Sequence, residues 1–159
     1  MTLISTSTSL NKQIRLFNLL ILLRAFFNKI IYSAELIYDF NLLISDIILN
    51  ITNIKYFWHL MNILKHSILF NYYQLNDLTC VDNLSLLKNL QDNNKNRFTL
   101  IYIFTNIKFN SRLIIKFTIN KNQRVPSLTN LFLCANWLER EVYDLFVLFF
   151  QIIRIYVEF

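Results

Sequence analysis

The sequence predicts an α+β fold in which a mixed β-sheet with a central antiparallel hairpin is covered by helices from the N-terminal half and by a C-terminal helix. Two segments in the middle of the chain alternate apolar and polar residues with the period of a strand. Apolar residues recur at helical spacing before these segments and again after them. The chain has 159 residues, 55% hydrophobic and 16% charged, which excludes a disordered protein and is sufficient for one hydrophobic core.

Strands are predicted at Arg97–Phe104 and Arg112–Ile119, where every second residue is apolar. The connection between them contains Asn106 and Asn110. Because asparagine is the best substitute for glycine in left-handed turns, and this chain has no glycine, we expect an antiparallel hairpin here. A third strand is predicted at Tyr73–Cys80.

A helix is predicted at Lys12–Ile31, where leucine, isoleucine and phenylalanine recur at helical period. A second, amphipathic helix is predicted at Lys55–Leu69. Glu35–Leu49 is rich in isoleucine, leucine and tyrosine, and its pattern is ambiguous between strand and helix. Asp82–Arg97 is rich in asparagine and aspartate and is predicted to be a loop that encloses one or two helical turns.

The C-terminal helix follows a polar connection, Asn120–Asn130, whose Val125–Pro126 step must be extended. Asn136 is a good N-cap, and Glu139 can close a capping box with it, so the helix should start at Trp137. Its predicted inward face consists of Leu138, Val142, Leu145 and Phe149.

Four charged residues gather on this helix: Glu139, Arg140, Glu141 and Asp144. A solvated charged face is one interpretation, and it would contribute only tenths of a kcal/mol, about the value of an exposed pair. A catalytic pair of acids is a weaker interpretation, because Glu139 and Asp144 both lie beside an arginine that would keep them ionised. An interface with another protein is the third.

The composition and the spacing of reactive residues exclude several kinds of site. Without glycine the chain has no phosphate-binding loop, dinucleotide fingerprint or nucleophile elbow. Cys80 and Cys134 are far apart and have no partner at ligand spacing, so we expect two small buried hydrophobic residues. His59 and His66 are expected at the surface or at a helix end. No catalytic residue, cofactor site or metal site is predicted.

Membrane insertion is not expected, because polar residues interrupt every apolar segment before it reaches the roughly 20 residues that a membrane core requires. Peripheral attachment through Leu16–Ile31 is an alternative. Met1–Asn28 superficially resembles a mitochondrial transit peptide. Because Met1 is retained, we expect synthesis inside the compartment where the protein works, or a cytosolic protein.

Two stretches carry a resemblance to a known family: Val125-Pro126-Ser127-Leu128-Thr129 and Ala135-Asn136-Trp137-Leu138-Glu139-Arg140-Glu141-Val142-Tyr143-Asp144-Leu145-Phe146. They resemble the signature of the thirty-kilodalton subunit of respiratory complex I (NADH:ubiquinone oxidoreductase), which is called subunit 9 where mitochondria encode it. Leu78–Asp82 and the two central strands are also similar to that family.

The resemblance implies a non-redox structural subunit without cofactors in the peripheral, matrix-facing arm of complex I at the mitochondrial inner membrane. It implies packing beside the forty-nine-kilodalton-type subunit of the quinone site, in support of electron transfer from NADH to ubiquinone, and contact with the membrane only through the complex. The abundance of Asn, Ile, Leu and Lys suits a mitochondrial gene. The expected interface residues are Trp137, Glu139, Arg140, Glu141, Tyr143 and Asp144.

The chain departs from the family pattern at its C-terminal end. Family members have glycine where this chain has Val147, and the substitution predicts a helix that continues where relatives turn. The long C-terminal segment of the family is replaced by nine unrelated residues, so it is either lost or supplied by another polypeptide. We expect a helical extension at 1–34, the family-like domain at 35–150 and a divergent end at 151–159.

Binding of organellar ribosomal RNA is a further alternative, because the net charge is +6. It would use strand aromatics as stacking platforms with basic residues around them. The residues in question are Phe98, Tyr102, Phe117, Arg97, Arg112 and Lys116. The aromatic and basic side chains alternate onto opposite faces, which favours a core, so we expect no nucleic acid partner.

Overall fold

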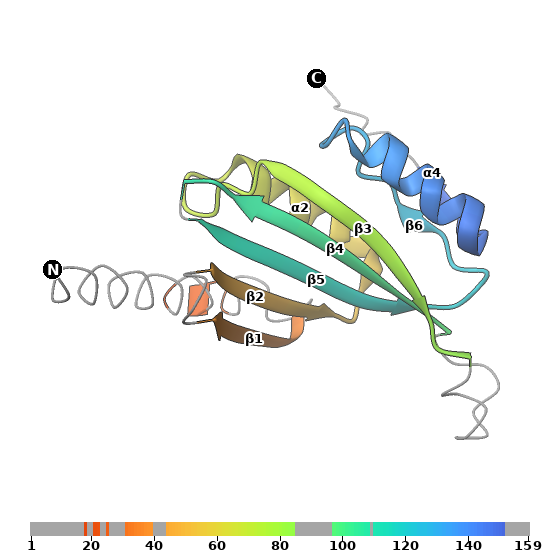
Figure 1. Ribbon diagram of the computed structural model, residues 1–159, viewed down its shortest axis with the longest axis horizontal. Coiled ribbons are helices and arrows are strands. Elements are labelled where there is room, and N and C mark those ends of the chain that lie inside the picture. Colours follow the sequence, from red (N-terminus) through yellow and green to blue (C-terminus); the bar gives the residue numbers. More distant parts are fainter. Residues whose placement is uncertain are drawn as a thin grey trace, which may run out of the picture.

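A computed structural model of the chain describes residues 18, 21–22, 25, 31–39, 44–84, 97–108 and 110–151. Five strands form one sheet in the order β1-β2-β5-β4-β3 (Figure 1). They are β1 (Ile31–Asp39), β2 (Ile44–Ile51), β3 (Gln74–Asp82), β4 (Phe98–Asn106) and β5 (Ser111–Ile119). Neighbouring strands are antiparallel except β2 and β5, which run parallel. The predicted α+β fold with a mixed sheet is therefore confirmed.

The central hairpin joins β4 to β5 in a register that pairs Phe98 with Ile119 and Asn106 with Ser111. Asn110 in its turn adopts a left-handed backbone with φ of 46°. Asn71, which lies shortly before β3, also adopts a left-handed backbone, with φ of 54°. Asparagine thus occupies two left-handed positions at which glycine is usually favoured, as predicted for the hairpin.

Helix α2 (Phe57–His66), which follows the short 3₁₀ helix η1 (Ile54–Tyr56), covers one face of the sheet (Figure 1). The Phe57 ring lies 4.9 Å from the ring centroids of both Tyr102 and Phe117. Every second residue of β4 and β5 is buried on this face, as the alternation predicted. Phe98, Tyr102 and Phe117 are all buried in the core, so these rings have no face available for stacking on a base.

The ambiguous segment Glu35–Leu49 forms parts of β1 and β2. In β2 the consecutive residues Ile47, Ile48 and Leu49 are all buried, so neither face of this strand is polar. A strand buried on both faces has no period-2 pattern, which explains why the sequence left this segment undecided.

The predicted helix Lys12–Ile31 lies almost entirely outside the described residues. The described positions 18, 21, 22 and 25 are helical, and Ile31 already belongs to β1. The interior of the predicted loop Asp82–Arg97, residues 85–96, also lies outside the described residues. The division of the chain at 34 and 150 stays a prediction.

Helix α4 (Ala135–Phe146) packs beside β3, the edge strand of the sheet (Figure 1). Its Phe146 ring lies 6.1 Å from that of Phe98. The connection before α4 contains β6 (Val125–Pro126), which is extended as predicted, and pairs in parallel with β7 (Phe150–Gln151). Lys65 of α2 fixes this connection, because its ammonium group donates to the Leu131 carbonyl and lies 4.9 Å from the centroid of the Phe132 ring.

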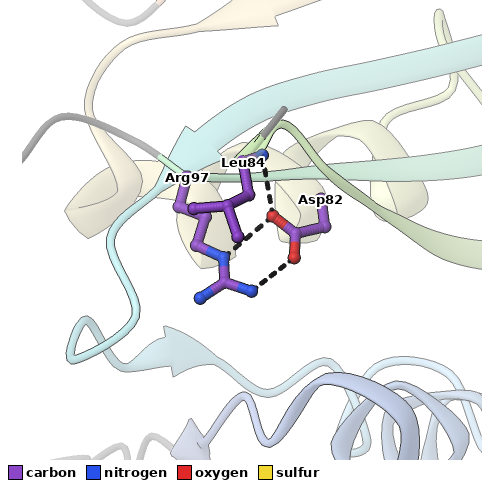
Figure 2. A network of polar contacts seen from close by, with 3 residues as sticks. All are labelled: Asp82, Leu84 and Arg97. Atoms are coloured by element: carbon purple, nitrogen blue, oxygen red, sulfur yellow. Dashed lines mark hydrogen bonds and ion pairs between the residues drawn. The ribbon is translucent and has the colours of Figure 1, made fainter. Parts of the chain in front are cut away.

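A bidentate ion pair joins the last residue of β3, Asp82, to Arg97, which directly precedes β4 (Figure 2). Arg97 Nε donates to Asp82 Oδ1 at 2.8 Å, and Arg97 Nη2 donates to Asp82 Oδ2 at 2.5 Å. The Leu84 amide donates to the same Oδ1 at 3.0 Å. Hydrogen bonding from Arg97 is the main cause that lowers the pKa of Asp82.

Replacement of Asp82 by asparagine is expected to lower the melting temperature at neutral pH, because the ion pair and its second acceptor oxygen are lost. A carboxylate with a lowered folded pKa stabilises the fold above its unfolded pKa, and this stabilisation disappears as the pH falls through the folded pKa. The melting temperatures of the wild type and of Asp82→Asn should therefore become equal in acid, below the usual Asp pKa of 3.8. Thermal melts followed by circular dichroism test this, with Asp77→Asn on the same strand as the control. If the difference in melting temperature persists in acid, the Asp82–Arg97 ion pair is not the cause of the stabilisation.

Candidate interaction surface

Helix α4 begins two residues before the predicted start. Its N-cap is Cys134, whose side chain does not cap the helix, and Asn136 lies in the first turn. The predicted capping box between Asn136 and Glu139 is therefore wrong. The Glu139 carboxylate is engaged by another segment, so it does not return to the N-terminus of its own helix.

Glu139 faces the interior, where it holds α4 to the segment that follows β6. Its Oε2 accepts from the Ser127 hydroxyl and its Oε1 accepts from the Leu128 amide, both at 2.7 Å. The residue is only 5% exposed. Burial raises the pKa of Glu139, while the hydrogen bonds from Leu128 and Ser127 act in the opposite direction. Glu139 is thus an internal anchor with two donors from its own chain.

The inward face of α4 agrees only in part with the prediction. Val142 is buried as predicted, together with Ala135 and Glu139, and Leu138 and Phe146 are partly buried against the core. Leu145 and Phe149 were predicted to face inward, and both are exposed. The pattern predicted the wrong inward residues for two reasons. The inward stripe contains a charged residue, and the helix ends at Phe146, before Phe149.

The outward side of α4 carries aromatic, aliphatic and charged residues together. Trp137 is 73% exposed and Leu145 is 69% exposed, and Glu141 lies between them one turn from each. Arg140 and Asp144 form an i,i+4 pair with a Nε–Oδ2 distance of 4.0 Å. Both side chains are largely in water, so this pair contributes only tenths of a kcal/mol to stability.

Tyr143 completes this surface near the C-terminal end of the helix. It is exposed, and its ring packs edge-on against Phe149 at 5.5 Å between centroids. We call six exposed residues of the helix the α4 surface: Trp137, Arg140, Glu141, Tyr143, Asp144 and Leu145. Five of the six predicted site residues are on it. Glu139 is not, and Leu145 was missed because its spacing assigned it to the core.

The reactive side chains elsewhere are dispersed. Within the described part of the chain, no three of the residues His, Cys, Asp and Glu gather at metal-binding distance. Burial raises the pKa of the Cys80 thiol to about 11, so this thiol is protonated at neutral pH. Cys134 is exposed, contrary to the prediction of a buried residue, and its thiol donates to the Leu75 carbonyl at 3.2 Å. His59 and His66 are exposed, as predicted.

None of the helices among the described residues is both long enough and apolar enough to span a membrane.

The sequence is similar to named subunits of respiratory dehydrogenases. It is 37% identical to NADH-ubiquinone oxidoreductase subunit 9 of Reclinomonas americana, over 57% of this chain and 41% of that protein. It is 38% identical to the mitochondrial NADH dehydrogenase [ubiquinone] iron-sulfur protein 3 of Candida albicans, over 57% of this chain and 30% of that protein. The matched stretch thus covers less than half of the length of these relatives.

Solved structures have the same fold. The trypsin-resistant fragment of Nqo5, residues 1–134, superposes with a TM-score of 0.57 and 26% identity, over 86% of this chain and 96% of the fragment. A chain of the membrane-bound sulfane sulfur reductase, an archaeal respiratory membrane complex, has a TM-score of 0.56 over 80% of this chain and 68% of that chain. Its 17% identity establishes likeness of fold alone.

The family model described as "Respiratory-chain NADH dehydrogenase, 30 Kd subunit" matches residues 52–152. The match includes β3, β4, β5 and α4, and so contains both the central hairpin and the helix with the exposed charged surface. Because it covers more than half of the chain, this protein belongs to the family of thirty-kilodalton subunits of respiratory-chain NADH dehydrogenase.

Proposed function

We propose that this protein is a non-redox structural and assembly subunit of the peripheral, matrix-facing arm of mitochondrial complex I. In this role it packs beside the forty-nine-kilodalton-type subunit of the quinone site and supports electron transfer from NADH to ubiquinone. Membership of the thirty-kilodalton subunit family supports the assignment to the complex. The relatives named as mitochondrial proteins or as subunit 9 support a mitochondrial location and a mitochondrial gene.

The observation that carries the structural role is the α4 surface. An exposed tryptophan and an exposed leucine lie on one helix beside an oppositely charged pair, Arg140 and Asp144. Tryptophan and arginine are among the residue types most enriched at energetic centres of protein interfaces. The inward side of the same helix is fixed by Glu139, so the surface is held in one orientation before a partner arrives.

Docking would change the energetics of the charged residues. In water the Arg140–Asp144 pair contributes little, but against a partner both groups would lose their hydration. Truncation of one member of a desolvated pair costs about 2–5 kcal/mol, which is enough to prevent assembly. The α4 surface is therefore expected to matter far more for the complex than for the fold of the isolated chain.

Replacement of Trp137 or Arg140 by alanine tests the proposal in the native organelle. We expect native gels to contain subassemblies in place of full-size complex I, and NADH:ubiquinone reductase activity to fall with the amount of assembled complex. Melting of the purified variants should be unchanged, because both side chains are exposed. Lys121→Ala, at an exposed turn position between β5 and β6 and outside α4 in the sequence, is the matched control.

Normal assembly and normal activity in both α4 variants would refute the proposed role. Mass spectrometry of the purified, cross-linked complex identifies the neighbour of α4, for which we propose the forty-nine-kilodalton-type subunit.

A further inference from the structure

Glu141 lies in the middle of an exposed row of side chains on α4. Residues four apart on a helix are neighbours on its surface, so Trp137, Glu141 and Leu145 form one continuous row. All three are exposed, the tryptophan by 73% and the leucine by 69%. The carboxylate is thus flanked on both sides by a large apolar group. A contact that buries both of these groups must also take the carboxylate out of water.

The helix itself offers Glu141 no cation. Side chains within reach of a helical residue are those three or four positions away, and none of these is basic for Glu141. One of them, Asp144, is acidic, and it lies 4.0 Å from the Nε atom of Arg140. Arg140 is the only basic residue of α4. The α4 surface therefore carries two exposed carboxylates and one guanidinium group.

The elements packed beside α4 do not supply the missing cation. Strand β3 packs against the helix, and its two charged residues, Asp77 and Asp82, are both acidic. Lys65 of α2 reaches the connection before α4, but its ammonium group donates to the Leu131 carbonyl there. Among the residues that the structure describes, Glu141 has no ion pair.

Burial of an unpaired carboxylate is strongly unfavourable, because the lost hydration is not replaced. An opposite charge with good geometry compensates for this loss. A guanidinium group is well suited, since it is weakly hydrated and can donate two parallel hydrogen bonds to a carboxylate. An ammonium group supplies the same charge from a single point. A partner that covers Trp137 and Leu145 must therefore bring a cation to Glu141.

Other kinds of occupant do not meet this requirement. The excess of carboxylates on the α4 surface repels anionic lipid headgroups and the phosphates of a nucleic acid. A second copy of this chain, docked through the same surface, would bring two more carboxylates and one more guanidinium group. Four carboxylates would then face two cations, so a symmetric contact leaves both copies of Glu141 without a cation of their own.

We propose that Glu141 pairs with an arginine or lysine of the neighbouring subunit, and that this basic residue lies between the apolar contacts of Trp137 and Leu145. The inference rests on the proposed function, because it specifies the chemistry of the partner at the α4 surface. The Arg140–Asp144 pair is neutral as a whole, so Glu141 determines which sign of charge the partner must carry. The two apolar groups supply affinity, and the carboxylate supplies specificity.

Photo-cross-linking in the purified complex identifies the partner residue. We expect benzoylphenylalanine at position 145 to link to another subunit, within four residues of an arginine or lysine. Glu141→Arg is expected to lose full-size complex on native gels, and replacement of that basic residue by glutamate should restore the complex in the Glu141→Arg background. Glu141→Gln should lose part of the complex. Lys121→Glu, a charge reversal at an exposed position outside α4, should assemble normally.

The outcomes separate this inference from the proposed function. If Trp137→Ala prevents assembly while both Glu141 variants assemble like the wild type, the inference fails and the proposed function stands. If Glu141→Arg loses the complex and the compensating glutamate does not restore it, the inference also fails. Cross-links from position 145 to lipid or to a second copy of this chain would overturn it as well. Thermal melts of purified Glu141→Arg should match those of the wild type, because the side chain is exposed.

Discussion

Replacement of Glu139 by alanine is expected to lower the free energy of unfolding by about 2–4 kcal/mol. The carboxylate accepts two hydrogen bonds of 2.7 Å in the interior, from the Ser127 hydroxyl and the Leu128 amide. Alanine removes both acceptors and leaves the Leu128 amide buried without its partner. Each unsatisfied buried donor costs about 1–3 kcal/mol, and hydrogen bonds to a charged acceptor are stronger than neutral ones.

The pH dependence of the same site has a defined sign. The pKa of Glu139 is raised in the folded protein, mainly by burial, above the usual value of 4.5. A group with a raised folded pKa favours the fold when it is protonated, so its stabilising contribution is complete below the unfolded pKa and is lost as the pH rises through the folded pKa. The wild type should therefore gain stability relative to Glu139→Gln as the pH falls from neutrality towards 4.5.

Urea titrations of the wild type, Glu139→Ala and Glu139→Gln at several pH values measure both effects. The neutral amide keeps the size of the side chain and one acceptor, so Glu139→Gln should be less destabilised than Glu139→Ala. Glu141→Ala is the matched control, because its side chain is exposed on the same helix and should change stability by less than about 0.5 kcal/mol. Equal stability of the two alanine variants would show that Glu139 is not an anchor.

The central hairpin could be predicted from the sequence because its two strands have one buried and one partly exposed face. Alternation is visible only under that condition. Strand β2 has no exposed face at Ile47, Ile48 and Leu49, because all three residues are buried. Only its pairing with β1 and β5 identifies it as a strand. Pairing with distant strands is information that a local pattern does not contain.

The candidate interaction surface on α4 could be predicted in part. The motif located the helix and most of its exposed residues, and the charges suggested an interface. The phase of the helix was wrong, because pattern analysis places a glutamate outside, whereas Glu139 points inward to donors on a segment twelve and eleven residues earlier.

Replacement of Val147 by glycine is expected to stabilise the protein. The resemblance to the family suggested that valine at this position would let the helix continue, and this was wrong: α4 ends at Phe146. Val147 itself adopts the left-handed conformation, with φ of 56° and ψ of 39°, and its amide donates to the Tyr143 carbonyl at 2.8 Å. The chain thus makes the turn of a C-terminal cap with a β-branched residue in a conformation that favours glycine.

The expected gain follows from two opposing effects. A left-handed residue with a side chain costs about 1–2 kcal/mol, which glycine avoids. Glycine gives back about 0.5–1 kcal/mol because it makes the unfolded chain more flexible. The side chain of Val147 is half exposed, so its removal loses little packing. The net effect should be a gain of about 1 kcal/mol, or a rise of about 2–4 °C in melting temperature for a domain of this size.

Val147→Asn separates the relief of backbone strain from the flexibility of the unfolded chain. Asparagine tolerates the left-handed conformation, but it does not increase the conformational entropy of the unfolded chain as glycine does. It should stabilise at least as much as Val147→Gly. Val81 is a matched control: it is similarly exposed but lies in the extended strand β3, where glycine relieves no strain and should destabilise by up to about 1 kcal/mol. If Val147→Gly and Val81→Gly shift the melting temperature in the same direction, the strain at the end of α4 does not exist.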